Sequence, residues 1–444
     1  MHLPKPITEI IERLEDEGYE AYVVGGCVRD SMMHMTAHDY DIATSALPLE
    51  TKRVFSFCRV IETGIKHGTV SVLYKGSCVE ITTFRVDGDY LDGRHPQSVD
   101  FSTKLSDDLS RRDFTINGIA YSHLRGFYDP FYGARDITLK IIRCIGDPEK
   151  RFSEDALRIL RALRFAAVLG FEIEENTKAA LIAHKSDIKQ VSKERIFAEL
   201  KRLICGKYVE RVILEFAEVF SEIIPELSAE INYEQGSKFH NSTLLEHTAR
   251  AVHAAPKEIH IRLAMLFHDI GKPLCRTTDE NGECHYYGHA EISARMTDGI
   301  LRGLKCDNAL RERVCEIVRL HDLPTEPNEK YVRKQLSKRG YELFCDILQA
   351  KIADNSAKIP EAAERIPLLL RTLELAEKIN AEQPCISLRS LAVNGNDLKR
   401  FIPPSAVMGE VLARLLEEVV DGEVENEKNV LLSRAREIYD SIKA

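Results

Sequence analysis

The hydrophobic period of the chain changes once along its length, and this change limits the possible folds more than any other feature. Up to about residue 140, short apolar runs at 21–24, 69–73 and 79–84 lie between turn signals, which is typical of strands mixed with helices. From about Ser153 onward, apolar residues recur at helical spacing, and Ser153 is placed to cap the first long helix. The sequence therefore predicts the α+β class, with an N-terminal mixed sheet and helices followed by an all-helical remainder.

Prolines divide the helical part, and the 444 residues suffice for several domains. We predict the regions 1–140, 141–220, 221–364 and 365–444.

No apolar run approaches the roughly 18 residues of a membrane span, and the N-terminus lacks a secretory stretch. The eleven cysteines include no C-x-x-C pair, which argues against a disulfide scaffold or a cysteine zinc site. A cytoplasmic protein without a membrane partner is expected, and no oligomeric state is predicted.

The net charge of −9 argues against a general polyanion binder, so any nucleic-acid contact must be regional. Residues 151–211 hold 13 Lys and Arg against 9 Asp and Glu, a local charge of +4. This segment is the expected RNA contact. Its candidate phosphate ligands are Lys193, Arg195, Lys201 and Arg202.

Two glycines, Gly25 and Gly26, stand where the first apolar strand ends and a helix begins, with Arg29 one turn later. Glycine lets backbone N–H groups approach an anion, and an arginine there can hold a phosphate. Taken alone, such a pair is more often only a structural turn. The pattern predicts a phosphate cradle if other phosphate-handling residues accompany it.

Three carboxylates accompany the predicted phosphate cradle, namely Asp39, Asp41 and Glu80. In an extended strand the first two face one side and can share a hard cation, whereas an isolated D-x-D is more often a solvated acidic turn. Glu80, a charge within an apolar strand, would complete the site. Three acids beside a phosphate cradle predict two-metal phosphoryl transfer with Mg²⁺.

Cations, an acid and an amide follow one another between Arg111 and Asn117. Arg112 would neutralise triphosphate charge, while Asp113 and Asn117 would hydrogen-bond the ribose hydroxyls. The alternative is an Arg–Asp surface pair of little energetic weight.

Taken in order, the segments 25–30, 38–45, 67–70 and 111–117 resemble the head motifs of the class II CCA-adding tRNA nucleotidyltransferase and bacterial poly(A) polymerase family. The resemblance implies a nucleotidyltransferase palm as the head. It also implies Asp39 and Asp41 as Mg²⁺ ligands, Glu80 as a further carboxylate, and contacts to the nucleotide from Gly26, Arg29 and Arg112.

Asp155 and Arg158 lie three residues apart in the predicted neck, residues 141–220. A carboxylate accepts from the exocyclic amine of cytosine or adenine and a guanidinium donates to the neighbouring ring acceptor, so the pair can select C and A over G and U. The alternative is a surface salt bridge. The segment 154–158 resembles the family's base-templating motif, which implies Arg161 and Arg164 as further nucleotide contacts.

His247, His268, Asp269 and Asp354 follow the H…HD…D order of a metal site built from separate helices. The pattern resembles an HD-domain phosphohydrolase, and His289 and His321-Asp322 are further possible ligands. A divalent transition metal or Mg²⁺ is expected in region 221–364, and the residues leave its identity and any hydrolysis open.

The resemblance predicts a CCA-adding enzyme that uses CTP and ATP, with tRNA held by the helical tail, 365–444. The segment 85–96 resembles the flexible loop that full CCA-adding members carry and CC-only members lack. The open alternatives are a poly(A) polymerase or a partial CC- or A-adding enzyme. A rival of another class is an HD phosphohydrolase with a nucleotide- or RNA-binding head.

Overall fold

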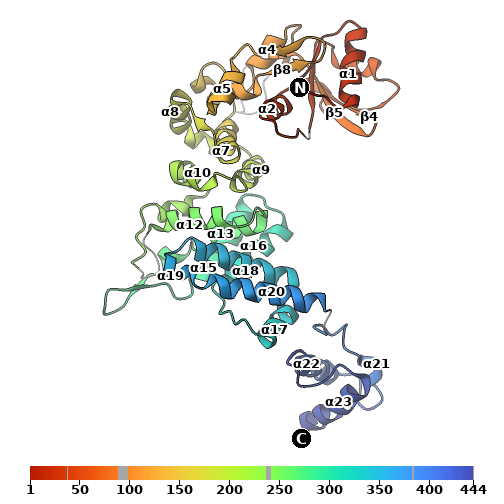
Figure 1. Cartoon of the computed structure of the whole chain (residues 1–444), viewed down its shortest axis with the longest axis vertical. Helices are drawn as coiled ribbons and strands as arrows, with labels where there is room; N and C mark the ends of the chain where they lie inside the picture. The colour runs from red at the N-terminus through yellow and green to blue at the C-terminus, as the bar shows by residue number, and fades with distance from the viewer. Residues whose placement is uncertain (38, 89–98, 237–241, 383–384, 444) are drawn as a thin grey trace. The chain divides into compact units, whose positions relative to one another are not determined.

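The computed structural model describes residues 1–37, 39–88, 99–236, 242–382 and 385–443 (Figure 1). The chain divides into two compact units, Met1–Pro225 and Glu226–Ala444, and each is described by itself. The α+β class is confirmed, because the N-terminal part carries a mixed sheet and the remainder is mostly helical. The finer division into four regions stays a prediction.

A seven-stranded sheet organises the start of the first unit, with strand order β3-β4-β5-β2-β1-β8-β9. Its strands are β1 (Ala21–Val24), β2 (Asp41–Thr44), β3 (Arg59–Ile61), β4 (Thr69–Tyr74), β5 (Ser77–Thr83), β8 (Ala120–Ser122) and β9 (Gly126–Tyr128). Within this sheet the described neighbours are antiparallel except for β2 and β5, which pair in parallel with Asp41 opposite Glu80 in register. Lys75 and Gly76 have φ of 47° and 82°, and they form the tight β4–β5 turn that the sequence predicted.

Helices pack on this sheet through their buried apolar residues. They are α1 (Lys5–Asp16), α2 (Gly26–Met32), α3 (Pro48–Val54) and α4 (Leu105–Ser110), while α5 (Gly133–Leu139) packs against α2 and Thr115–Asn117. One core cluster joins the strand residues Tyr22, Val24 and Ala43 to Leu105 and Leu109 of α4. The short strands β6 (Arg85–Asp87) and β7 (Val99–Phe101) pair antiparallel. Residues 89–96 of the segment 85–96, which was predicted to be a flexible loop, lie outside the described residues.

The first unit continues as α6 (Pro148–Glu154), α7 (Leu157–Leu169), α8 (Glu175–Ala183), α9 (Lys193–Ile204), α10 (Val209–Glu215) and α11 (Ala217–Ile223). Two details correct the sequence analysis. Ser153 lies inside α6 and the long helix α7 begins only at Leu157, because an extended residue separates the two helices. A parallel pair, β10 (Ile141–Ile142) and β11 (Glu172–Ile173), shows that the remainder is not purely helical.

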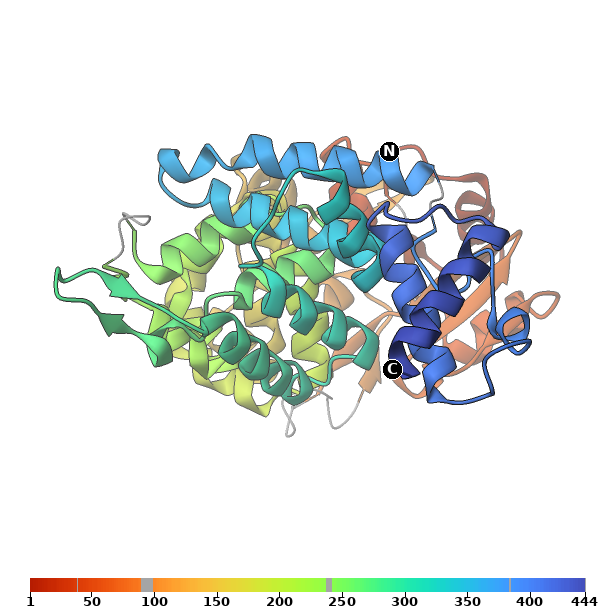
Figure 2. The same ribbon diagram turned by 90° about the horizontal axis from the view of Figure 1, so that it is seen from below.

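The second unit begins with α12 (Leu244–Ala254), α13 (Ile259–Phe267) and α14 (Lys272–Cys275), followed by the hairpin β12–β13 (Thr277–Thr278, Cys284–His285). It continues with α15 (His289–Gly303), α16 (Asn308–Leu320), α17 (Glu329–Arg339), α18 (Tyr341–Ser356), α19 (Pro360–Ala363) and α20 (Ile366–Ala381). The last helices are α21 (Gly395–Leu398), α22 (Ala406–Val420) and α23 (Lys428–Lys443), of which α22 and α23 lie side by side (Figure 2). Their shared apolar residues, among them Val411, Leu415 and Leu431, form a separate cluster.

Within the described residues, no helix combines the length and apolar character that crossing a membrane requires. All eleven cysteines are free.

Candidate functional site

A cavity of about 610 Å³ opens in the first unit where the ends of β1 and β2 face α7 and α9. Its wall gathers residues that are up to 139 positions apart in the chain but were predicted to act together. They are Gly25, Gly26, Arg29, Asp39, Asp41, Arg112, Asp113, Asn117, Asp155, Arg158, Arg161 and Arg164. Glu80 and the candidate phosphate ligands Lys193 and Lys201 lie outside the lining of this cavity, whereas Arg195 and Arg202 belong to it.

Gly25 forms the turn between β1 and α2, with φ of 77°, a conformation that side chains with a Cβ rarely adopt. A Cβ at this position would lie 3.0 Å from Nη1 of Arg112. The glycine therefore allows the Arg112 guanidinium to pass close over the turn. On the following helix, Arg29 Nη1 donates to Oδ1 of Asn117 at 2.6 Å, which fixes this guanidinium at the cavity wall.

The acids lie at the start of β2. Asp39 precedes the strand and Asp41 is its first residue, so the prediction that both belong to one strand is wrong. Glu80 is the in-register partner of Asp41 on β5 and is exposed. The three carboxylates do not form one of the described groups whose oxygens all lie within 4.8 Å of one another. Like charges without a cation between them are expected to separate in this way.

The carboxylate of Asp41 is in an environment that disfavours its charge. Partial burial against the cavity wall, together with the nearby charges of Glu80 and Asp39, raises the pKa of Asp41 against the opposing effect of Arg112. Among the residues that the structure describes, neither Asp39 nor Asp41 has an ion-pair partner. This end of the cavity therefore presents two acids that a cation would stabilise.

Asp113 organises the opposite wall from a buried position. Its Oδ2 accepts from Nε of Arg161 at 2.7 Å, and its Oδ1 accepts from Nδ2 of Asn117 at 3.0 Å and from the backbone N–H of Phe114 at 2.8 Å. Although burial opposes ionisation, Arg161 and these hydrogen bonds lower the pKa of Asp113 to about 2. The alternative of a weak surface Arg–Asp pair is wrong, because this carboxylate is only 7% exposed.

Asp155 and Arg158 both line the cavity but do not pair with each other. Asp155 is extended at the end of α6, where Oδ1 accepts from the backbone N–H of Leu157 at 3.1 Å and Oδ2 accepts from Nη2 of Arg195 at 2.7 Å. Nη1 of Arg158 instead donates to Oε2 of Glu154 at 2.7 Å. The alternative of a surface salt bridge between Asp155 and Arg158 is therefore wrong.

The ring of Phe165 lies among three guanidiniums of this wall. Cζ of Arg164 lies 4.0 Å from the ring centroid, and those of Arg29 and Arg161 lie 5.0 and 5.7 Å away. Arg164 Nε also donates to Oε2 of buried Glu199 at 2.5 Å. Aromatic stacking and buried ion pairs hold these cations in fixed positions. Phe165 and Glu199 were not predicted from the sequence, because only the arginines carried a recognisable pattern.

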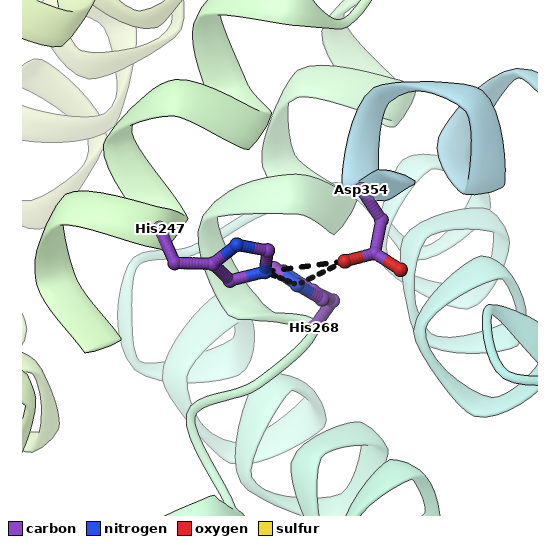
Figure 3. Close-up of side chains that lie close together, drawn as sticks. All are labelled: His247, His268 and Asp354. Atoms are coloured by element: carbon purple, nitrogen blue, oxygen red, sulfur yellow. Dashed lines mark hydrogen bonds and ion pairs between the residues drawn. The ribbon is translucent and has the colours of Figure 1, made fainter. Parts of the chain in front are cut away.

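A second cluster lies in the second unit, where α12 supplies His247, the segment after α13 supplies His268 and Asp269, and α18 supplies Asp354. All four are buried. His247 Nε2 lies 3.1 Å from His268 Nε2 and 3.1 Å from Oδ1 of Asp354 (Figure 3). Asp269 Oδ2 lies 3.1 Å from His268 Nε2. The structure therefore brings together the four side chains predicted for this metal site.

The two carboxylates of this cluster, Asp269 and Asp354, stabilise positive charge on the neighbouring His268. Although burial opposes it, Asp269 and Asp354 raise the pKa of His268 to about 10. Lys272 Nζ lies 2.7 Å from Asp269 Oδ2, and Lys358 Nζ lies 2.6 Å from Asp354 Oδ2. Even so, Asp269 Oδ2 and Asp354 Oδ1 accept no well-formed hydrogen bond from the described residues. Buried oxygens of this kind, facing imidazole nitrogens, fit a divalent cation.

Comparisons with known proteins identify the family of the chain. The sequence model of the family described as "Poly A polymerase head domain" matches residues 21–143, and that of "tRNA nucleotidyltransferase domain 2" matches residues 288–435. The chain is 36% identical to the CCA-adding enzyme of Lactobacillus delbrueckii over 423 residues, which is 94% of this chain and 93% of the relative. It is 35% identical to that of Geobacillus stearothermophilus over 425 residues, again 94% and 93%.

Solved structures give the same result. The CCA-adding enzyme of Bacillus stearothermophilus in complex with CTP superposes with a TM-score of 0.78 at 31% identity, covering 99% of both chains. That of Thermotoga maritima, complexed with tRNA, shares the fold at 19% identity, with a TM-score of 0.58 over 98% of this chain and 94% of its own.

Proposed function

Because this chain belongs to the family of CCA-adding enzymes, we propose that it adds C, C and A to the 3′ end of tRNA in the cytoplasm. CTP and ATP are the substrates. In each step the terminal ribose hydroxyl of the RNA attacks the α-phosphorus of the nucleotide, the bond to the β-phosphate breaks, and pyrophosphate leaves. The observation that carries the proposal is one cavity that holds three features: two acids with no ion-pair partner among the described residues, a wall of fixed arginines, and Asp155 with Arg158.

Asp39 and Asp41 are proposed as the Mg²⁺ ligands, with Glu80 close enough in the sheet to assist. The donor set fits, because Mg²⁺ prefers carboxylate oxygens and, among the described residues, neither carboxylate forms an ion pair with a side-chain cation. When bound, the ions supply activation of the hydroxyl and neutralisation of the triphosphate. The chain's own contribution is to place Arg29 and Arg112 where they attract the phosphates and to hold them there through Asn117 and Asp108.

Asp155 and Arg158 are proposed to select the base without a nucleic-acid template. The Asp155 carboxylate would accept from the amine of cytosine or adenine, and Arg158 would donate to the adjacent ring nitrogen or carbonyl. Glu154 and Arg195 hold these two groups in place, so their geometry does not depend on the bound base. Arg161 and Arg164 complete the nucleotide-facing wall.

We expect Asp155→Asn to reduce the preference for CTP over UTP by about 5- to 150-fold, because a discriminating base contact contributes roughly 1–3 kcal/mol. The measurement is kcat/KM for each nucleotide on a tRNA lacking its terminal A, C and C. Asp187→Asn is the matched control, because Asp187 is an acid of the same part of the chain that pairs with His184 instead. An unchanged preference in Asp155→Asn would remove this residue from base selection.

Product length tests the proposal as a whole. With a tRNA lacking its last three nucleotides, we expect two nucleotides to be added from CTP alone and three from CTP and ATP together. No nucleotide should be added from ATP alone. A ladder from ATP alone would indicate a poly(A) polymerase instead. Arrest after CC in the presence of both nucleotides would indicate a partial CC-adding enzyme.

The buried cluster in the second unit supports a second function. We propose that His247, His268, Asp269 and Asp354 hold a divalent transition metal or Mg²⁺ of an HD-type phosphohydrolase site. The support is the convergence of two imidazole nitrogens and two carboxylates at 3.1–3.6 Å. Figure 3 shows three of these side chains, His247, His268 and Asp354. Equilibrium dialysis of the full chain tests this proposal. His247→Ala with Asp354→Ala is expected to lose one cation per chain, and an unchanged cation content would contradict the site.

A further inference from the structure

A second cavity of the first unit adjoins the arginine-lined cavity described above. It has a volume of about 430 Å³ and lies between the N-terminal end of α1, the segment before β2 and the start of β5. Its lining consists of Pro4, Ile7, Ala37, Asp39, Tyr40, Ser77, Cys78 and Val79. Among the described residues, Asp39 alone lines both cavities. The two cavities therefore meet at a carboxylate that is proposed to bind Mg²⁺.

The parallel pairing of β2 with β5 explains why the second cavity forms beside this carboxylate. Asp41 and Glu80 are the first residues of the pairing, so Ser77–Val79 extend β5 beyond the start of β2. The side chains of Val79 and Ile7 are only 2% and 3% exposed, and they give the cavity a closely packed apolar side. The sheet and α1 therefore fix this side of the cavity.

The two cavities differ in charge and therefore in the ligands that they can hold. Seven arginines line the first cavity. In the described lining of the second cavity, Asp39 is the only side chain with a full charge, and the other polar groups are the hydroxyls of Tyr40 and Ser77 and the thiol of Cys78. Asp39 would repel a phosphate there, because no cation of the lining balances it. The second cavity therefore suits an uncharged ligand that carries hydroxyl groups.

The geometry of the proposed reaction requires a site of this kind. In phosphoryl transfer the attacking and leaving oxygens lie roughly in line with the phosphorus, so the hydroxyl approaches from the side opposite the pyrophosphate. The triphosphate is proposed to lie toward Arg29 and Arg112 in the arginine-lined cavity. The RNA terminus then has to reach Asp39 from another direction, and the second cavity opens at that residue.

We propose that the second cavity holds the 3′-terminal nucleoside of the acceptor RNA, with the ribose hydroxyls near Asp39 and the base against the ring of Tyr40. This inference rests on the proposed nucleotide addition and names the site of its second substrate. The volume of about 430 Å³ lies within the roughly 300–1,000 Å³ of small-molecule pockets, so one nucleoside fits. The phosphate that precedes the nucleoside remains outside the cavity, because Asp39 would repel it.

Tyr40 suits the succession of terminal nucleosides that this reaction creates. The terminus is first the unpaired end of the shortened RNA, then C, and then C again, so the cavity has to accept more than one base. Stacking on an aromatic ring tolerates any base, because every base has a π-face. Base selection by Asp155 and Arg158 takes place in the other cavity. A change at Tyr40 should therefore affect all three additions by similar factors.

Removing the terminal base of the RNA tests the cavity directly. The acceptor is a tRNA that ends in CC, with or without the base of its terminal nucleoside, and AMP addition is measured as kcat/KM for the RNA. We expect loss of the base to lower this value about 5- to 150-fold in the unmodified chain, the usual effect of one stacked base. Tyr40→Leu should cause a similar loss with the intact RNA, and removal of the base should then add less than about twofold.

Tyr128→Leu is the matched control, because Tyr128 is an exposed tyrosine of β9 in the same sheet and lines neither cavity. This variant should retain the full effect of the base. Tyr40→Phe keeps the aromatic ring and should retain the effect as well. In Tyr40→Leu, KM for ATP at saturating RNA should stay within about twofold of that of the unmodified chain, because the arginine-lined cavity is unchanged.

Losses from Tyr40→Leu and from the missing base that simply multiply would overturn the proposal, as would an equal rise in KM for ATP and for RNA. Circular dichroism identifies misfolded variants. Ser77→Phe, which fills the cavity, is a second variant and should weaken RNA binding more than ATP binding. Failure of the unmodified chain to extend the intact RNA would contradict the proposed function instead. The dissociation constants of both RNAs, measured without nucleotide, would still show whether Tyr40 contacts the terminal base.

Discussion

Asp41→Asn is expected to reduce CTP incorporation by about 10³-fold or more, which is the loss typical when a charge that stabilises the transition state is removed. Asp41 is the first residue of β2 and lines the cavity beside Asp39. Asparagine keeps the shape of the side chain but loses the negative charge that binds Mg²⁺. The measurement is kcat/KM for CTP at saturating tRNA and several Mg²⁺ concentrations.

Two further variants sharpen this result. Glu80→Gln should lose less activity than Asp41→Asn, because Glu80 lies outside the cavity lining whereas Asp41 belongs to it. Glu62→Gln, which removes an exposed carboxylate paired with Lys52, should retain full activity. Near-normal incorporation by Asp41→Asn would contradict the metal assignment, whereas equal losses in Asp41→Asn and Glu80→Gln would show that Glu80 is a full ligand.

Arg161→Ala is expected to lower the free energy of unfolding of the first unit by about 3 kcal/mol, because it leaves the buried Asp113 carboxylate without its cation. The two are joined by hydrogen bonds of 2.7 and 2.6 Å from Nε and Nη2. Urea unfolding followed by circular dichroism measures the change. Arg53→Ala is the control, because Arg53 forms only an exposed pair with Glu17 and should change stability by less than about 1 kcal/mol. Equal losses in the two variants would contradict the role of the Asp113 pair.

Acid titration gives an independent expectation for the same group. The pKa of Asp113 is lowered from 3.8 to about 2 in the folded protein, so its contribution to stability is fully present above pH 3.8. It is lost as the pH falls through about 2, and the shift corresponds to roughly 2 kcal/mol. Asp113→Asn should therefore be less stable than the unmodified chain at neutral pH, and this difference should shrink below pH 3.8. A difference that is independent of pH would show that Asp113 is not ionised in the folded state.

Local sequence patterns predicted the local parts of the fold. The Lys75-Gly76 turn, the strand that ends at Val24 and the helix that begins at Gly26 were all predicted, because turn residues and hydrophobic period act over only a few positions. The start of α7 was predicted wrongly. Ser153 is a good cap by residue type, but Asp155 occupies the extended position and accepts the hydrogen bond from Leu157.

The partners of the site residues could not be predicted, because they are distant in the chain. Asp155 pairs with Arg195 across 40 residues and Asp113 with Arg161 across 48, and no periodicity connects such positions. The pairing of β2 with β5 likewise brings Asp41 opposite Glu80 only once the sheet forms. In the second unit the H…HD…D order predicted four ligands. The approach of His289 and His321 to within 3.3 and 3.8 Å of Oδ1 of Asp269 required the packed helices.

The 3′ ends that the enzyme makes test the central claim most directly. A tRNA lacking its last three nucleotides is incubated with the full chain, Mg²⁺ and all four nucleoside triphosphates together, and the product ends are sequenced. The cavity that Asp155 and Arg158 line predicts ends that read CCA, without G or U at any of the three positions and without further addition. Products that contain G or U, or tRNA that remains unextended, would contradict the account.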